Sequence, residues 1–357
     1  MSPTNYTMIG LMSGTSGDGL DIAYCSYELQ DQWSYEILDA ITIPFPIDLG
    51  SKLMNCHKLS AMDLALLDVS FGKWMGEKVK EYCTEKQIKP LAICSHGHTV
   101  FHQPAKGLSL QIGNGWALHH ASGQRVINDF RMKDIQLGGQ GAPLVPIGDR
   151  LLFPNIDFCI NLGGIANISM ESAGKRIAFD TCPFNLLMNA QANELGAEYD
   201  KDGDWAKEGM LNEKLFTALN ALPYYSRNNA KSLGREDLED DFIPLLSESG
   251  LSEKDLLATL VEHYAFQIAK VIKRHQPTAQ PSVLITGGGA YNSYFIERLD
   301  SQLNNSWFHT EATPELIEFK EALVFGFLGV LRLRKENNCL ASVTGADLDS
   351  SGGVIYG

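Results

Sequence analysis

Residues 9–24 read IGLMSGTSGDGLDIAY, and this stretch decides the fold because apolar segments flank the polar turn at 13–19. Two β-prone segments around a short glycine-rich turn predict a β-hairpin. Glycine tolerates the positive φ that such a turn needs and lets the main chain approach a ligand. Successive free N–H groups in that geometry form an anion site, most often for phosphate. The hairpin is therefore a candidate phosphate-binding loop, although ordinary turns use the same residue types.

Four side chains of this hairpin suit a nucleotide phosphate. The hydroxyls of Thr15 and Ser16 can donate to phosphate oxygens. The carboxylates of Asp18 and Asp21 can hold a hydrated Mg²⁺. We therefore expect a phosphate group and its metal ion at this turn.

A second glycine-rich turn between strands occurs in residues 157–181, DFCINLGGIANISMESAGKRIAFDT. The pattern predicts strands at 158–162, 166–170 and 176–180, with a Gly-Gly turn between the first two. The first hairpin thus has a counterpart in the other half of the chain. Two candidate phosphate loops, one in each half, are harder to dismiss as plain turns than one.

A third glycine cluster, Gly287 to Gly289, follows an apolar strand and opens a helix in residues 283–299, VLITGGGAYNSYFIERL. That context suits a main chain that faces a nucleotide with its N–H groups. Three glycines alone are a weak signal, because tight turns from strand to helix use the same residues. The chain contains no GxxxxGK[ST] segment and no GxGxxG after a strand, so neither a Walker-type nor a dinucleotide site is expected.

Asp180 ends a predicted strand just before Pro183, which we expect at the first position of a helix. One interpretation of this carboxylate is a helix cap. The other is a general base at the mouth of a cleft between domains. Phosphoryl transfer needs little covalent help, so one base, one metal ion and a phosphate cradle would suffice.

Three histidines, His96, His98 and His102, lie close together in the sequence SHGHTVFH. The His-x-His spacing occurs in metal hydrolases. However, neither a third carboxylate ligand nor an HExxH segment accompanies it. We expect histidines that contact substrate or pack in the core rather than a transition-metal site.

Composition and charge limit the classes of protein to which the chain can belong. The 357 residues are 44% hydrophobic and carry a formal net charge of −14, which should repel nucleic acid and anionic membranes. No segment approaches the roughly 20 apolar residues of a membrane span, and the N-terminus does not resemble a signal peptide. Seven cysteines without a Cys-x-x-Cys pair fit a reducing compartment. We expect a cytoplasmic protein that binds neither nucleic acid nor membrane.

The order of elements predicts an α/β protein of two domains. Turn residues cluster near 128–141, and a new run of strands begins beyond them. We expect a first lobe of residues 1–128 plus about 340–357, which carries the first phosphate hairpin. Residues 129–339 would form a second lobe with the second hairpin, Asp180 and the Gly287–Gly289 loop.

Taken together, the loops resemble those of the sugar kinase, Hsp70 and actin superfamily. More specifically, the chain resembles the 1,6-anhydro-N-acetylmuramic acid kinase family. The resemblance covers nearly the whole chain, from residue 10 to residue 346, and implies two related ribonuclease H-like domains with a nucleotide cleft between them. The matching segments are GLMSGTSGDGLD, SHGHTVFH, NDFR, GGQGAPLVP, NLGGIANIS, FDTCPFNLLM, KSLGRE, GGGAYN, EALVFGFLG and SVTGA.

The resemblance implies an enzyme that opens the 1,6-anhydro ring with water while it moves the ATP γ-phosphate onto O6. The products would be N-acetylmuramic acid 6-phosphate and ADP, in the recycling of peptidoglycan. The resemblance also implies ATP and Mg²⁺ as cofactors, a small-molecule sugar substrate and a homodimer. It places the base at Asp180 and sugar contacts at His96, Arg131 and Glu321. The implied ATP contacts are Gly14, Thr15, Ser16, Gly17, Asp18, Gly19, Leu20, Asp21, Gly163, Gly164, Asn167, Gly287, Gly288 and Gly289.

The chain departs from the family pattern beside the base, and other functions stay open. The family segment FDTGPGN reads FDTCPFN here, with Cys182 and Phe184 in place of two glycines. Gly17 stands where the family has a bulky residue, and Asn189 stands for a helix aspartate. The alternatives are a kinase of another sugar on the same scaffold and a glycoside hydrolase that uses Asp180 and Glu321 without nucleotide. A third is a nucleotide-binding regulator without activity.

Overall fold

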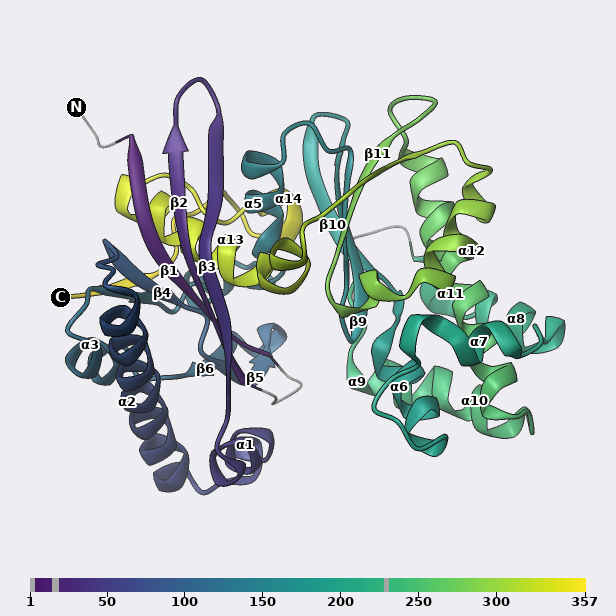
Figure 1. The fold of residues 1–357 in the computed structure, drawn as a ribbon, viewed down its shortest axis with the longest axis horizontal. Coiled ribbons are helices and arrows are strands. Elements are labelled where there is room, and N and C mark those ends of the chain that lie inside the picture. The colour runs from purple at the N-terminus through teal and green to yellow at the C-terminus, as the bar shows by residue number, and fades with distance from the viewer. Residues whose placement is uncertain (1–3, 15–18, 228–230) are drawn as a thin grey trace. The chain divides into compact units, whose positions relative to one another are not determined.

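The computed structural model describes residues 4–14, 19–227 and 231–357, which form two compact units. Unit 1 comprises Met1–Phe153 and Phe319–Gly357, and unit 2 comprises Pro154–Glu318 (Figure 1). The first boundary therefore falls after residue 153 rather than after residue 128. Residues 129–153 belong to unit 1, where Arg131 donates a hydrogen bond to His96. The chain returns to unit 1 inside a helix, before residue 340.

Unit 1 is built on a six-stranded sheet of order β13-β7-β4-β1-β2-β3. Strands β1, β2 and β3 are antiparallel neighbours, and β4 and β7 run parallel to β1. The first hairpin is thus present as predicted, with Ser13 opposite Leu20. The strands are β1 (Asn5–Ser13), β2 (Gly19–Leu29), β3 (Trp33–Pro44), β4 (Ala92–Ser95), β7 (Val126–Asn128) and β13 (Val354–Tyr356).

Helices pack against this sheet, and one of them approaches β1 unusually closely. A Cβ atom at Gly10 would lie 1.8 Å from the carbonyl oxygen of Ala322 in α13, so only glycine fits at that point of β1. A small hairpin of β5 (His98–Gln103) and β6 (Leu108–Ile112) lies beside the sheet. The helices are α1 (Ile47–Met54), α2 (Ala61–Lys86), α3 (Gly115–Ser122), α4 (Met132–Gln136), α5 (Val145–Leu152), α13 (Pro314–Arg334) and α14 (Ala341–Thr344).

Unit 2 repeats the topology of unit 1. Its sheet has the order β10-β9-β8-β11-β12, which matches the order β3-β2-β1-β4-β7 in unit 1, where β13 adds a sixth strand at the edge. The first three are antiparallel, and the fourth and fifth are parallel to the first. Two related ribonuclease H-like domains are therefore confirmed. The strands are β8 (Phe158–Leu162), β9 (Ile165–Ser172), β10 (Lys175–Pro183), β11 (Ser282–Thr286) and β12 (Phe308–Thr310).

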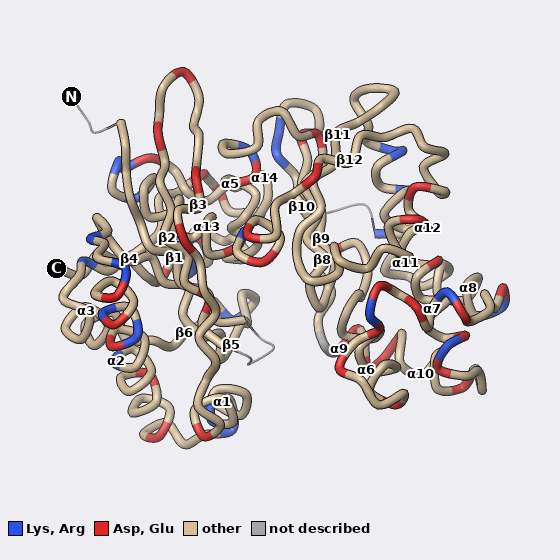
Figure 2. Tube along the Cα trace, in the orientation of Figure 1, with Lys and Arg blue, Asp and Glu red and all other residues tan. Residues whose placement is uncertain are grey.

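The core of unit 2 lies between this sheet and its helices, chiefly α11, whose inner face is buried along most of its length. Acidic and basic residues are interspersed along α2 of unit 1 and around α7 and α8 of unit 2 (Figure 2). No helix of the described segments is both long and apolar enough to cross a membrane. The helices are α6 (Asn185–Glu194), α7 (Asp204–Glu208), α8 (Glu213–Asn220), α9 (Arg235–Asp237), α10 (Ile243–Glu248), α11 (Glu253–His275) and α12 (Ser293–Leu303).

Candidate functional site

The turn of the first hairpin lies largely outside the described residues. Its ends, Gly14 and Gly19 to Asp21, are described, whereas the predicted contacts Thr15, Ser16, Gly17 and Asp18 are not. Asp21 lies on β2, half-buried, and its Oδ1 accepts a 2.6 Å hydrogen bond from the Thr42 hydroxyl on β3. Within the described residues, no three His, Cys, Asp or Glu side chains are grouped to hold a metal ion. The pairing of Asp18 with Asp21 on Mg²⁺ therefore stays a prediction.

The three predicted sugar contacts of unit 1 come from three distant segments and lie near one another. His96 follows β4, Arg131 precedes α4, and Glu321 lies in α13. The Arg131 guanidinium donates to His96 Nε2 at 2.8 Å and to the Gly141 carbonyl at 2.7 Å. His96 Nδ1 lies 3.0 Å from the Gly97 carbonyl, which assigns the ring proton to Nδ1. The histidine is thereby fixed as a neutral acceptor from arginine.

Burial and mutual charge set the protonation of this cluster. Burial, assisted by the Arg131 charge, holds the pKa of His96 well below its usual value. Burial also lowers the pKa of Arg131 to about 10, against the opposing effect of Glu321. The pKa of Glu321 is raised by burial, while the charges of Arg131 and Lys320 oppose the rise. A guanidinium, a neutral imidazole and a carboxylate together offer donors and acceptors for a polar ligand such as a sugar.

The other two histidines of SHGHTVFH have separate partners. His98 is buried, with its Nδ1 3.0 Å from the Ser13 hydroxyl at the end of β1. His102 Nδ1 lies 3.1 Å from the Ser109 hydroxyl on β6. Each imidazole is therefore engaged with a hydroxyl group rather than with a shared metal position.

Asp180 lies on β10, the edge strand of unit 2, where the ladder to β9 shifts between Asp180 and Cys182. Its N–H donates to the Lys231 carbonyl at 3.1 Å, and its Oδ2 accepts from the Leu233 N–H at 2.9 Å. Among the described residues, none donates to Oδ1. Burial raises the pKa of Asp180 to about 6, while the Leu233 N–H opposes the rise. The carboxylate is thus mainly ionised at neutral pH and has an oxygen available to accept a proton, as a general base requires.

The structure contradicts the interpretation of Asp180 as a helix cap. Helix α6 begins at Asn185, with Phe184 as its N-cap residue and no side-chain cap. Pro183 is the last residue of β10 rather than the first of the helix, because pairing with Ile165 of β9 continues to that point. The carbonyls of Gly163 and Gly164 accept from the first N–H groups of the helix instead.

Polar side chains form a row across the sheet of unit 2. Asn161 on β8 lies opposite Asn167 on β9, which lies opposite Asp180 on β10. Directly opposed residues of antiparallel strands project to the same face, so the three half-buried side chains are neighbours. A Cβ at Gly287 would lie 2.6 Å from Asn161 Oδ1. The row therefore runs from the third glycine cluster to Asp180, and Asn161 is a member that the sequence analysis missed.

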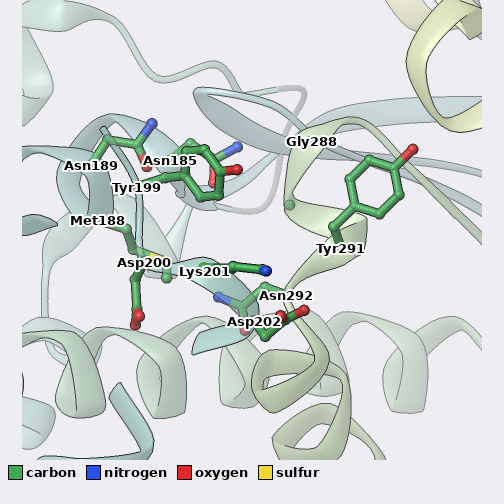
Figure 3. A pocket seen from close by; sticks show the side chains of 11 residues that line it. Asn185, Met188, Asn189, Tyr199, Asp200, Lys201, Asp202, Gly288, Tyr291 and Asn292 are labelled. Carbon is green, nitrogen blue, oxygen red and sulfur yellow. The ribbon is translucent and has the colours of Figure 1, made fainter. Parts of the chain in front are cut away.

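A cavity of about 470 Å³ lies in unit 2 beside the Gly287–Gly289 loop. Figure 3 shows that Tyr199 and Tyr291 lie to either side of Gly288 in this view. The two tyrosine residues are 58% and 46% exposed, which leaves part of each side chain open to a ligand. A cavity of this size with aromatic faces and a few polar groups suits a nucleoside. Its lining is Asn185, Met188, Asn189, Tyr199, Asp200, Lys201, Asp202, Gly288, Gly289, Tyr291 and Asn292.

The three consecutive glycines have different roles at this cavity. Gly287 has φ 82°, and Gly289 leaves no room for a side chain because its Cβ would lie 2.4 Å from the Phe184 ring. At Gly288 the nearest neighbour of an added Cβ would be Asn185 Nδ2, at 3.9 Å. Gly287 and Gly289 are therefore required by the fold, whereas Gly288 presents open main chain to the cavity.

Cys182 and Phe184, which stand where the family resemblance implies glycines, both lie in the core. Each side chain is fully buried. The Phe184 ring packs against Tyr264 and Phe295, with ring centroids 5.3 and 4.9 Å away. The two larger residues therefore do not fill the cavity, and Asn189, the other departure in this helix, lines it.

Comparison with known proteins gives one consistent family. Residues 6–357 match the family model for anhydro-N-acetylmuramic acid kinase. A protein of that name from Sulfurimonas denitrificans is 35% identical, over 98% of this chain and 98% of its own length. Its namesake from Vibrio cholerae is 35% identical, over 98% of this chain and 97% of its own length. A solved ROK hexokinase from Thermus thermophilus aligns with a TM-score of 0.39 at 13% identity, which is too low to carry an argument.

Proposed function

The chain belongs to the anhydro-N-acetylmuramic acid kinase family, and from this premise we propose the reaction that it performs. It is an ATP-dependent kinase that opens the 1,6-anhydro ring of anhydro-N-acetylmuramic acid with water and phosphorylates O6. The products are N-acetylmuramic acid 6-phosphate and ADP, in the recycling of cell-wall peptidoglycan. The full-length match at residues 6–357 carries this conclusion.

Asp180 is the base in this proposal. It takes a proton from a water molecule whose oxygen bonds to C1 of the sugar. As the C1–O6 bond breaks, O6 attacks the γ-phosphorus, and ADP leaves with the electrons of the broken phosphoanhydride bond. The raised pKa of about 6 supports this role, because it lies close to the pH at which the base must work. Alignment of water, C1, O6 and phosphorus contributes more than the strength of the base.

The ATP contacts are proposed in both units. In unit 1 they are the hairpin residues Gly14 to Asp21, and in unit 2 they are Gly163, Gly164 and Asn167. We place the adenosine in the cavity beside Gly287–Gly289, because its two exposed tyrosine rings and its open glycine main chain suit a nucleoside. His96, Arg131 and Glu321 contact the sugar in this proposal, supported by the hydrogen bonds that bring a guanidinium and an imidazole together.

Of the two proposed Mg²⁺ ligands, the structure describes Asp21 and not Asp18. Magnesium is commonly held through one or two carboxylates together with substrate phosphates. Asp21, a half-buried carboxylate oriented by the Thr42 hydroxyl, is a suitable first ligand, with Asp18 as the second. When bound, the ion would neutralise charge on the phosphates. A homodimer, which rests on the family resemblance, and a cytoplasmic location, which rests on the cysteine usage and the N-terminal sequence, complete the proposal.

One assay separates the proposed kinase from its alternatives. The protein is incubated with anhydro-N-acetylmuramic acid, with and without ATP and Mg²⁺, and the products are identified by mass spectrometry. We expect ring-opened sugar phosphate only when ATP is present. Ring opening without ATP would indicate a glycoside hydrolase, and phosphorylation of a different sugar alone would indicate another kinase. Nucleotide binding with no product from any sugar would indicate the regulator.

A further inference from the structure

The main-chain hydrogen bonds between Asp180 and the neighbouring segment at residues 231–233 differ from those of a regular β-sheet. The outward N–H of Asp180 pairs with the Lys231 carbonyl, as in a sheet. The outward carbonyl of Asp180, however, accepts from the Tyr224 hydroxyl at 2.5 Å. The next donor of the neighbouring segment, the Leu233 N–H, is then directed to the Asp180 carboxylate at 2.9 Å. A main-chain donor that would ordinarily extend the sheet thus serves the functional side chain.

The two donors are held firmly in place. The side chains of Tyr224 and Leu233 are buried in the core of unit 2. The Lys231 ammonium lies 4.4 Å from the centre of the Tyr224 ring and donates to the Tyr224 carbonyl at 3.4 Å. Beyond Leu233, the Gly234 N–H donates to the Asp237 carboxylate at 2.7 Å. The donor to Asp180 therefore belongs to a packed segment rather than to a free loop.

We propose that the main-chain N–H of Leu233 is a positioning group for the base, with the Tyr224 hydroxyl as the group that makes it available. The inference rests on the proposed role of Asp180. By occupying Oδ2, the N–H fixes the orientation of the carboxylate and leaves Oδ1 to take the proton. Because it donates to the charged form, it also favours the ionised carboxylate.

Two titratable groups that face Asp180 stay neutral near pH 6, because burial raises their pKa values. Burial raises the pKa of Cys182, on the same strand, to about 12. Burial also raises the pKa of Tyr224, which faces Asp180 from the opposite segment. The basic side chains of Lys231 and Arg227 lie against the Tyr224 ring, and burial lowers the pKa of Lys231. The fall of kcat/KM at low pH forms the acid limb of the pH profile. An acid limb near pH 6 that moves when the N–H is removed would therefore reflect the protonation of Asp180.

The test compares Leu233→Pro, which removes the N–H, with Leu233→Ala, which keeps it. Both variants lose the buried leucine side chain, so packing loss is common to the pair. The readout is kcat/KM for the sugar as a function of pH. We expect the acid limb to move upward by about one pH unit in Leu233→Pro, because hydrogen bonds to charged groups are worth that much or more. We expect the limb of Leu233→Ala to stay at its wild-type position.

Coincident limbs in the two variants would overturn the proposal. Should Leu233→Pro fail to fold by circular dichroism, an ester in place of the amide at residue 233 removes the N–H while the side chain is kept, and the same shift is expected. Asp180→Asn, measured in parallel, separates the two claims. If Asp180→Asn retains turnover, the proposed base is wrong, whereas if it is inactive and the limbs coincide, only the positioning role fails.

Discussion

Replacement of Asp180 by Asn should stabilise unit 2 at neutral pH while it removes turnover. Burial raises the folded pKa of this carboxyl from 3.8 to about 6. The folded state therefore binds the proton more tightly than the unfolded state, and stability falls as pH rises from about 4 to about 6. Each pKa unit is worth about 1.4 kcal/mol, so the cost of the charge at pH 7.5 is at most about 3 kcal/mol. Asparagine removes that charge and can still accept from the Leu233 N–H.

The matched control is Asp255→Asn, the same change at another carboxylate of unit 2. The Met210 N–H lowers the pKa of Asp255, so its charge contributes stability that is present at neutral pH and is lost as pH falls through the folded pKa. Differential scanning calorimetry at pH 7.5 and 4.5 measures both variants. We expect Tm to rise by a few degrees for Asp180→Asn at pH 7.5 and by less at pH 4.5, where the folded carboxyl is protonated. Asp255→Asn should lower Tm at both pH values, since both lie above the pKa of this group in the unfolded state. A loss of stability in Asp180→Asn, as for a helix cap, would refute this reasoning.

Three further predictions concern activity and binding. The kcat/KM of the wild type should fall about tenfold per pH unit below pH 6, because Asp180 becomes protonated there. Glu321 also has a raised pKa and is the alternative source of this pH dependence. If Glu321→Gln shows the same fall in kcat/KM, Glu321 is excluded as its source. Gly288→Ala should fold normally and raise the KM for ATP but not the KM for sugar. Gly287→Ala should lower Tm, because φ is 82° at this residue and a Cβ atom would clash. Equal effects of the two variants on Tm and on the KM for ATP would contradict the assignment of the cavity to adenosine. Arg131→Lys should raise the KM for sugar about tenfold and leave the KM for ATP unchanged. The reason is that an ammonium group cannot reproduce the planar arrangement in which the guanidinium donates two hydrogen bonds. An unchanged KM for sugar would exclude a contact between Arg131 and the sugar.

The sequence predicted the hairpins and their duplication because their signals are local. Alternating apolar residues around glycine turns at 13–19 and 163–164 specify strand pairs without any tertiary information. Both hairpins are present, and each begins a sheet of the same strand order. The position of Asp180 near the end of a strand followed from the same pattern.

The parts that sequence reasoning missed depend on register and packing. Asn161 joins Asn167 and Asp180 only through the alignment of three strands, which no single segment encodes. The cavity combines residues 185–202 with 288–292, and asparagines, tyrosines and a lysine at those spacings match no motif. The signal that could have found Asn161 is its place directly before Leu162 and the Gly-Gly turn, in strand alternation with the apolar positions. The sequence pattern predicts Pro183 at the start of a helix, because proline favours that position, but pairing with β9 keeps Pro183 in the strand.

The central claim is that water enters at C1 and phosphate is added at O6 in one reaction that depends on Asp180. Incubation with anhydro-N-acetylmuramic acid, ATP and Mg²⁺ in ¹⁸O-labelled water tests it most directly. We expect one ¹⁸O atom at the C1 hydroxyl of the sugar phosphate, unlabelled phosphate on O6, and no product with Asp180→Asn. Labelled inorganic phosphate as the only product, or labelled ring-opened sugar formed by Asp180→Asn at the wild-type rate, would contradict it.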